Sequence, residues 1–127
     1  MSDQKIKEGG NKMKLLIVDD DAVIQRLYKE ELEEEGYNVI IAATGRSALE
    51  KFEKDRPDLV TLDILMPDID GISLLRKMKE QRPHIPILMS TAFDYRDDFA
   101  VWASEAYIVK SSDLSELKEQ IKKFSDK

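Results

Sequence analysis

One stretch near the N-terminus decides the fold: Lys14-Leu15-Leu16-Ile17-Val18-Asp19-Asp20-Asp21. Its first five residues form a short apolar run, which is typical of a strand buried inside a sheet. A second run of this kind, Asp58-Leu59-Val60-Thr61-Leu62, leads into Asp63. Both predicted strands therefore end in aspartate.

This crowding of aspartates predicts a metal site. Ionised carboxylates a few ångströms apart repel one another and raise each other's pKa, so they rarely gather for the sake of stability. A hard divalent cation between them removes the repulsion, and Mg²⁺ takes oxygen ligands only. We therefore expect Asp19, Asp20 and Asp63 to form an acidic Mg²⁺ pocket.

The composition excludes several classes of protein. The chain has 127 residues, enough for one domain, with 42% hydrophobic and 36% charged residues. It has no cysteine, which excludes disulfides and thiolate metal sites. No apolar stretch is long enough to span a membrane or to form a signal peptide, so we expect a cytoplasmic protein. The net charge of -6 argues against direct binding to nucleic acid.

Predicted strands and helices alternate along the chain. We expect residues 1–13 to be a disordered lead-in or a cloning remnant, and residues 14–127 to form the domain. The predicted strands cover 14–18, 37–42, 58–63, 86–91 and 106–110, and the predicted helices are centred on 24–32, 46–55, 72–81, 94–102 and 114–124. The helix at 94–102 is short. Such alternation predicts an α/β fold with a doubly wound parallel sheet, whose ligands bind beyond the carboxyl ends of the strands.

Two more polar residues stand at predicted strand ends, Thr91 and Lys110. Together with the aspartates they suit phosphoryl transfer, which needs in-line positioning and neutralised phosphoryl oxygens. Two carboxylates can hold Mg²⁺ while the third attacks phosphorus and forms an acyl phosphate. The Lys110 ammonium and the Thr91 hydroxyl can then contact the phosphoryl oxygens.

Four motifs also carry a family resemblance: Leu15-Leu16-Ile17-Val18-Asp19-Asp20, Asp63-Ile64-Leu65-Met66-Pro67-Asp68-Ile69-Asp70-Gly71, Leu88-Met89-Ser90-Thr91-Ala92 and Ala106-Tyr107-Ile108-Val109-Lys110. In this order and spacing they resemble the receiver domain of two-component response regulators, of the single-domain chemotaxis or sporulation type. The resemblance runs from about Lys14 to the C-terminus. It implies a flavodoxin-like five-stranded sheet of order 2-1-3-4-5 with five helices, the fourth of them short.

The resemblance also implies roles for the pocket residues. Asp63 would accept a phosphoryl group from a histidine kinase, in a Mg²⁺-dependent reaction. The metal would be held by Asp19, Asp20, Asp63 and the backbone carbonyl of Met66. Lys110 would pair with the phosphoryl group.

The remaining implied roles concern switching and dephosphorylation. Thr91 and Tyr107 would form a switch pair, with the hydroxyl moving toward the phosphoryl group and the ring turning inward behind it. Leu65 and Phe93 occupy positions that tune water access in the family, and two apolar residues there suggest a slowly hydrolysing acyl phosphate. One departure is Ser111, which follows Lys110 where the family usually has proline.

The sequence leaves several functions open. The chain would be a phosphoprotein of signal transduction and no enzyme beyond promoting its own phosphorylation and dephosphorylation. It could also serve as a phosphorelay intermediate, or as a degenerate receiver that acts by binding alone. A Mg²⁺-dependent aspartyl phosphohydrolase fits less well, because Leu65 stands where that class has an acid/base carboxylate. A flavin carrier fits poorly as well, because its first loop must cradle a phosphate that Asp19–Asp21 would repel.

The expected partners are proteins. They are a sensor histidine kinase or phosphotransfer protein, and an unknown downstream target protein; neither a membrane nor nucleic acid is expected. The short segment between Thr91 and Tyr107 makes us expect a monomer. The domain could be free-standing or part of a larger protein.

Overall fold

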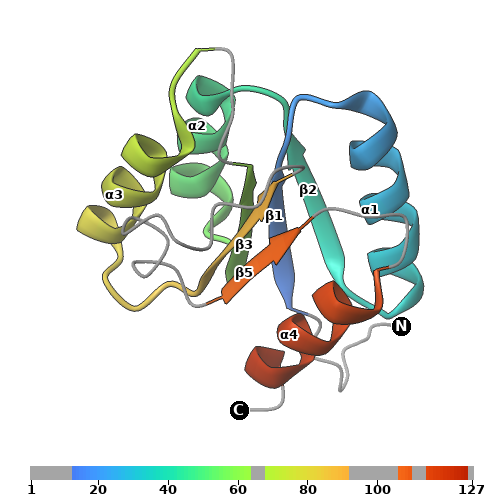
Figure 1. Ribbon diagram of the computed structural model, residues 1–127. Coiled ribbons are helices and arrows are strands. Elements are labelled where there is room, and N and C mark those ends of the chain that lie inside the picture. Colours follow the sequence, from blue (N-terminus) through green and yellow to red (C-terminus); the bar gives the residue numbers. More distant parts are fainter. Residues whose placement is uncertain (1–12, 64–67, 92–105, 110–113, 126–127) are drawn as a thin grey trace.

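The computed structural model describes residues 13–63, 68–91, 106–109 and 114–125. Strands and helices alternate through these ranges, as predicted (Figure 1). The elements are β1 (Lys14–Val18), α1 (Ala22–Glu34), β2 (Asn38–Ala42), α2 (Gly45–Asp55), β3 (Leu59–Asp63), α3 (Gly71–Gln81), β4 (Ile87–Thr91), β5 (Ala106–Val109) and α4 (Ser115–Ser125). The short helix predicted over 94–102 lies outside the described residues.

The strands form one parallel sheet of order β2-β1-β3-β4-β5. In Figure 1, α2 and α3 lie on one face of the sheet, and α1 and α4 lie on the other. The predicted doubly wound parallel α/β fold is therefore confirmed. Because β1 and β3 lie side by side and run in the same direction, both deliver their carboxyl ends to one edge of the sheet.

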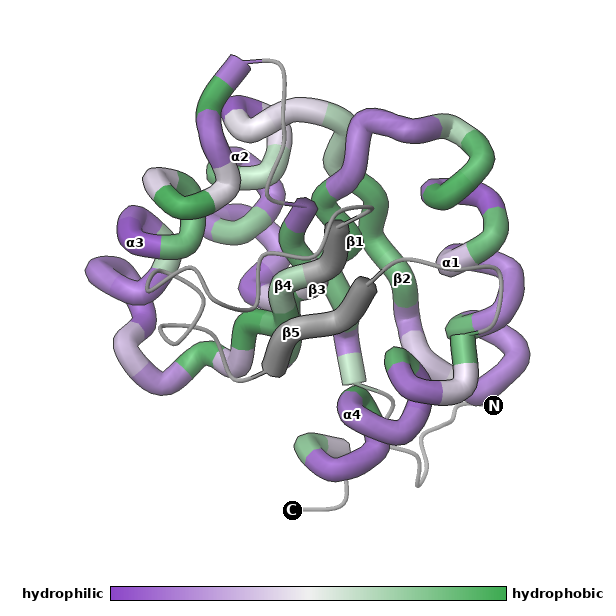
Figure 2. The backbone as a smooth tube through the Cα atoms, viewed as in Figure 1, coloured by the Kyte–Doolittle hydropathy of each residue, from purple (hydrophilic) through white to green (hydrophobic). Residues whose placement is uncertain are grey.

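Each face of the sheet carries its own hydrophobic core. Leu16 and Val18 of β1 pack in the core beneath α2 and α3, whereas Leu15 and Ile17 pack in the core beneath α1 and α4. Successive strand residues point to opposite faces, so a strand covered on both sides is apolar throughout. Figure 2 shows this apolar interior, with the polar residues on the outer surfaces of the helices.

Local sequence signals set the ends of the helices. Asp21 is the N-cap of α1, and its carboxylate accepts hydrogen bonds from the backbone N–H groups of Val23 and Ile24. Gly36 follows α1 with a φ of 99°, a left-handed conformation that glycine adopts without steric penalty. Helix α2 ends two residues before Pro57, as predicted.

An ion pair joins the last helix to the first. The Lys118 ammonium lies 2.8 Å from a Glu31 carboxylate oxygen and 3.7 Å from one of Glu35. The hydrogen bond that the Lys118 ammonium donates to the Glu31 carboxylate raises the pKa of Lys118. Within the ranges that the structure covers, no helix is long and apolar enough to cross a membrane.

Candidate metal centre

Asp19 and Asp20 directly follow β1. The backbone N–H of Asp19 donates to the carbonyl of Ala42 over 3.1 Å, which extends the pairing with β2 one residue beyond β1. The Asp19 side chain is 2% exposed, and its Oδ1 accepts the backbone N–H of Asp21 over 2.9 Å. The Gln25 amide donates to the Asp19 carbonyl over 2.7 Å. Asp19 is therefore held on both its backbone and its side chain, whereas Asp20 is exposed.

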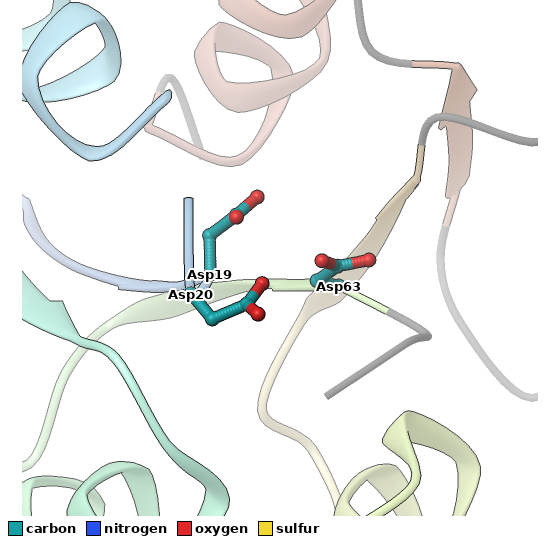
Figure 3. Close-up of side chains that lie close together, drawn as sticks. All are labelled: Asp19, Asp20 and Asp63. Carbon is teal, nitrogen blue, oxygen red and sulfur yellow. The ribbon is translucent and has the colours of Figure 1, made fainter. Parts of the chain in front are cut away.

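Asp63 is the last residue of β3 and is 5% exposed. Its backbone pairs with that of Ser90 in β4, so the sheet fixes its position on that side. Asp19, Asp20 and Asp63 each offer a carboxylate oxygen within 4.8 Å of the others. Figure 3 shows the three side chains gathered beyond the ends of β1 and β3. The predicted acidic cluster is thus present.

The donor set of this cluster fits a hard divalent cation. All three ligands are carboxylate oxygens, which Mg²⁺ and Ca²⁺ prefer, and no nitrogen or sulfur ligand is needed. Two of the three side chains are almost fully buried, where unit charges are screened less than at the surface. Asp20 is exposed and leaves the cluster open to solvent on one side. Mg²⁺ usually keeps several water ligands, which suits a site of this kind.

Asp70 lies outside the cluster and caps α3. Its Oδ1 accepts the backbone N–H groups of Ile72 and Ser73, and its Oδ2 accepts the Ser73 hydroxyl. The hydrogen bonds from the backbone and the hydroxyl of Ser73 hold the pKa of Asp70 below its usual value. Asp70 is therefore the N-cap of α3.

Asp68 has a role that the sequence did not reveal. Asp68 accepts hydrogen bonds from the backbone N–H groups of Gly45 and Arg46 at the start of α2. These two hydrogen bonds lower the pKa of Asp68, and the bond from Gly45 has the larger effect. The partners lie 23 and 22 residues away in sequence, so no local spacing signals the contact.

The structure covers the other predicted site residues only in part. Thr91 is the last residue of β4 and Tyr107 the second of β5, but their side chains are outside the described part. The backbone register pairs Thr91 with Val109, the residue before Lys110. Four predicted residues lie outside the described residues: Leu65, Met66, Phe93 and Lys110.

Comparison with known families decides what kind of domain this is. The model of the response regulator receiver domain matches residues 15–122. The chain belongs to this family. The resemblance inferred from the four motifs is thereby confirmed.

Individual relatives differ in how much of their length this receiver matches. It is 44% identical over 85 residues to the alkaline phosphatase synthesis transcriptional regulatory protein PhoP of Bacillus subtilis, a match covering 67% of this chain and 35% of PhoP. It is 36% identical over 114 residues to sporulation initiation phosphotransferase F of B. subtilis, covering 87% of this chain and 92% of that protein. The receiver thus spans about a third of PhoP but nearly all of phosphotransferase F.

Among solved structures, the response regulator TrrA of Thermotoga maritima in complex with Mg²⁺-BeF is similar. It has a TM-score of 0.84 and 42% identity, and the match covers 88% of this chain and 98% of TrrA. A second structure contains TrrA in complex with the histidine kinase ThkA and gives a TM-score of 0.83 at the same identity, covering 88% of this chain and 97% of that one.

Proposed function

We propose that this receiver is a phosphorylation-controlled switch in which Asp63 accepts the phosphoryl group and Asp19, Asp20 and Asp63 hold Mg²⁺. The observation that carries the proposal is the gathering of these carboxylates within 4.8 Å at the ends of adjacent strands. Membership of the receiver family and the similarity to TrrA, solved with Mg²⁺-BeF, support it.

The backbone supports Asp63 as the nucleophile. Asp19 has one carboxylate oxygen engaged by the N–H of Asp21, an arrangement suited to a fixed ligand. Asp63 ends the central strand β3 between β1 and β4 and stands one position from the switch residue Thr91 in the strand register. Asp63 therefore lies on the strand between β1, which leads into Asp19 and Asp20, and β4, which ends at Thr91.

The reaction is a simple displacement at phosphorus. An oxygen of Asp63 attacks the phosphorus of a phosphohistidine, and the P–O bond forms as the P–N bond breaks. The electron pair of the P–N bond leaves with the imidazole, which takes up a proton. Mg²⁺ at the three aspartates would supply positive charge beside the phosphoryl oxygens. The products are an aspartyl phosphate and a neutral histidine.

The remaining pocket residues act on the phosphorylated state. We assign Lys110 to pairing with the phosphoryl group, the Met66 carbonyl to the metal, and Thr91 with Tyr107 to the switch. The ends of β4 and β5, which the register pairs at Thr91 and Val109, support this. We further propose a short helix over 94–102, and slow hydrolysis because Leu65 and Phe93 are apolar.

The first partner would be a histidine kinase in the cytoplasm, as TrrA is seen with ThkA. Its histidine must reach the pocket, so the kinase must cover the adjoining surface. The start of α1 provides an apolar patch there: Val23 is 72% exposed, and a depression of about 330 Å³ is lined by Ala22, Val23, Arg26, Leu27 and Glu30. A contiguous apolar depression, unlike a single exposed apolar side chain, is typical of a protein contact. We propose this patch as the docking surface for the kinase, and a monomer that acts on a downstream protein.

A role as phosphorelay intermediate is the second candidate. The match to sporulation initiation phosphotransferase F covers 92% of that protein, and this similarity supports a phosphotransfer role. An intermediate passes its phosphoryl group on to a histidine. Incubation of the phosphorylated receiver with a phosphotransfer protein would distinguish an intermediate from a terminal switch.

The test of the proposal is intact-mass spectrometry after incubation with Mg²⁺ and acetyl phosphate. The wild-type chain should gain one phosphoryl group, and the gain should vanish without Mg²⁺ or in Asp63→Asn. Asp58→Asn is the matched control, because it removes an equal charge at the opposite end of β3. An adduct on Asp63→Asn equal to that of the wild type would refute the assignment.

A further inference from the structure

The connection between β3 and α3, which begins after Asp63, is hydrogen-bonded to the start of helix α2. Asp68, five residues after Asp63, accepts the N–H of Gly45 at Oδ1 over 2.8 Å and the N–H of Arg46 at Oδ2 over 3.1 Å. Both carboxylate oxygens are thus used on one helix end. The start of α3 lies beside the start of α2 in Figure 1. Asp68 therefore joins two parts of the chain that the sheet topology alone does not connect.

The contact is built around a glycine. A Cβ added to Gly45 would lie 1.7 Å from Cγ2 of Ile69 and 3.1 Å from its Cβ. Real Cβ atoms essentially never approach another heavy atom within 3.0 Å, so any larger residue would displace Ile69. The φ of Gly45 is not what requires glycine here; the close approach of the next chain segment is.

The N–H groups at the start of α2 are shared between two acceptors. The first N–H groups of a helix have no partner within the helix and carry partial positive charge. The Thr44 hydroxyl accepts the N–H of Ser47 over 3.0 Å, and Asp68 takes those of Gly45 and Arg46. Thr44 acts within its own helix end, whereas Asp68 reaches it from the connection after Asp63. Thr44 is therefore a helix cap, whereas Asp68 links the connection to another helix.

We propose that Asp68 is a positioning residue for the metal and phosphoryl site, acting by anchoring the far end of the connection that starts at Asp63. The inference rests on the proposed function. At its near end the connection is fixed by the pairing of Asp63 with Ser90 in the sheet. A short chain held at both ends has fewer conformations than one released at an end, so less ordering opposes ligand binding to it.

The first test compares Mg²⁺ affinity, measured by calorimetry, in Asp68→Ala and Thr44→Ala. Both variants remove an acceptor from the same helix end, but only the first releases the connection. Asp68→Ala should weaken Mg²⁺ binding about fivefold or more, in the usual range for coupled sites. Thr44→Ala should stay within about twofold of the wild type, as expected for an independent site.

Gly45→Ala tests the same contact from the other side. It removes no hydrogen-bonding side chain and exchanges glycine for a better helix former, so loss of helix stability cannot explain its effect. The added methyl group should push Ile69 and Asp68 away and weaken Mg²⁺ binding as Asp68→Ala does. Shortening Ile69 in the double variant Gly45→Ala, Ile69→Ala removes the clashing Cγ2 and should restore binding.

A third readout uses reciprocity between the two ends of the connection. If Asp68 anchors the site, Mg²⁺ must in turn tighten the anchor. NMR amide exchange should therefore slow at Gly45 and Arg46 when Mg²⁺ is added, while Ser47, bonded to Thr44, stays unchanged. Unchanged exchange at all three amides, or equal losses of affinity in Asp68→Ala and Thr44→Ala, would overturn the inference and leave the proposed function intact. Failure of the wild-type chain to bind Mg²⁺ would overturn both.

Discussion

Asp19 and Asp63 leave adjacent parallel strands at the same edge of the sheet, and their carboxylates, 2% and 5% exposed, offer oxygens within 4.8 Å of each other. At that separation two unit charges repel by about 3 kcal/mol at an effective dielectric constant of about 20. The fold brings the two carboxylates together through the backbone pairing of β1 with β3. A bound divalent cation would turn this repulsion into attraction for both.

Mg²⁺ should accordingly stabilise the wild-type protein against unfolding. At a concentration about a hundred times the dissociation constant, the expected gain is about 2.7 kcal/mol. Asp19→Asn should lose most of this gain, because it removes one charge and one ligand oxygen from the site. Thermal unfolding with and without Mg²⁺ measures the difference.

Asp58→Asn serves as the control for that experiment. Asp58 lies at the opposite end of β3, where its carboxylate accepts the backbone N–H of Lys14, a bond that an asparagine oxygen can retain. Its response to Mg²⁺ should match that of the wild type. Equal stabilisation of Asp19→Asn and Asp58→Asn would mean that the cation binds elsewhere.

Asp70→Ala should destabilise the domain by about 1 kcal/mol at neutral pH, because it removes the N-cap of α3. The pKa of Asp70 is lower in the folded protein than its value of 3.8 in an unfolded chain. Its charged form therefore stabilises the fold above about pH 4, and this contribution disappears as the pH falls through the folded pKa. Urea unfolding of the wild type and Asp70→Ala at neutral and acidic pH measures the difference in their free energy of unfolding.

In that series Asp70→Ser should lose less stability, since a serine oxygen still caps the helix. A stability difference between the wild type and Asp70→Ala that keeps its full size at pH values below the folded pKa of Asp70 would show that the carboxylate charge is not the source of the effect.

Val23→Ser should slow phosphorylation by a histidine kinase but not phosphorylation by acetyl phosphate. The side chain is 72% exposed at the start of α1, so its loss should scarcely alter stability or labelling by acetyl phosphate. Phosphotransfer from a cognate histidine kinase should slow about tenfold, as expected for the loss of an apolar anchor at the centre of an interface. Equal kinase-driven rates in both proteins would place the kinase elsewhere.

The sequence predicted the cluster of aspartates because the strands that lead into them can be recognised from short local patterns. The apolar runs before Asp19 and Asp63 mark buried strands, and the alternation with helices makes those strands parallel. Parallel strands share one carboxyl edge, so the meeting of their end residues follows from the topology. The capping by Asp21 is also a local feature, since its carboxylate accepts the N–H of Val23 two residues away.

Features that depend on long-range packing were not predictable. Successive strand residues point to opposite faces, but the sequence does not tell which core Leu15 enters and which Leu16 enters, because strands covered on both faces are apolar at every position. The bond of Asp68 to Gly45 joins residues 23 positions apart and depends on how α2 and α3 pack. No local sequence pattern around Asp68 or Gly45 indicates that the two residues are partners.

The most direct test of the account is the chemical location of the phosphoryl group. After labelling with acetyl phosphate and Mg²⁺, borohydride reduction converts an aspartyl phosphate into homoserine, and peptide mass spectrometry locates the changed residue. The account predicts homoserine at position 63 and unchanged aspartate at positions 19 and 20. Homoserine at position 19 or 20, with Asp63 unmodified, would contradict it.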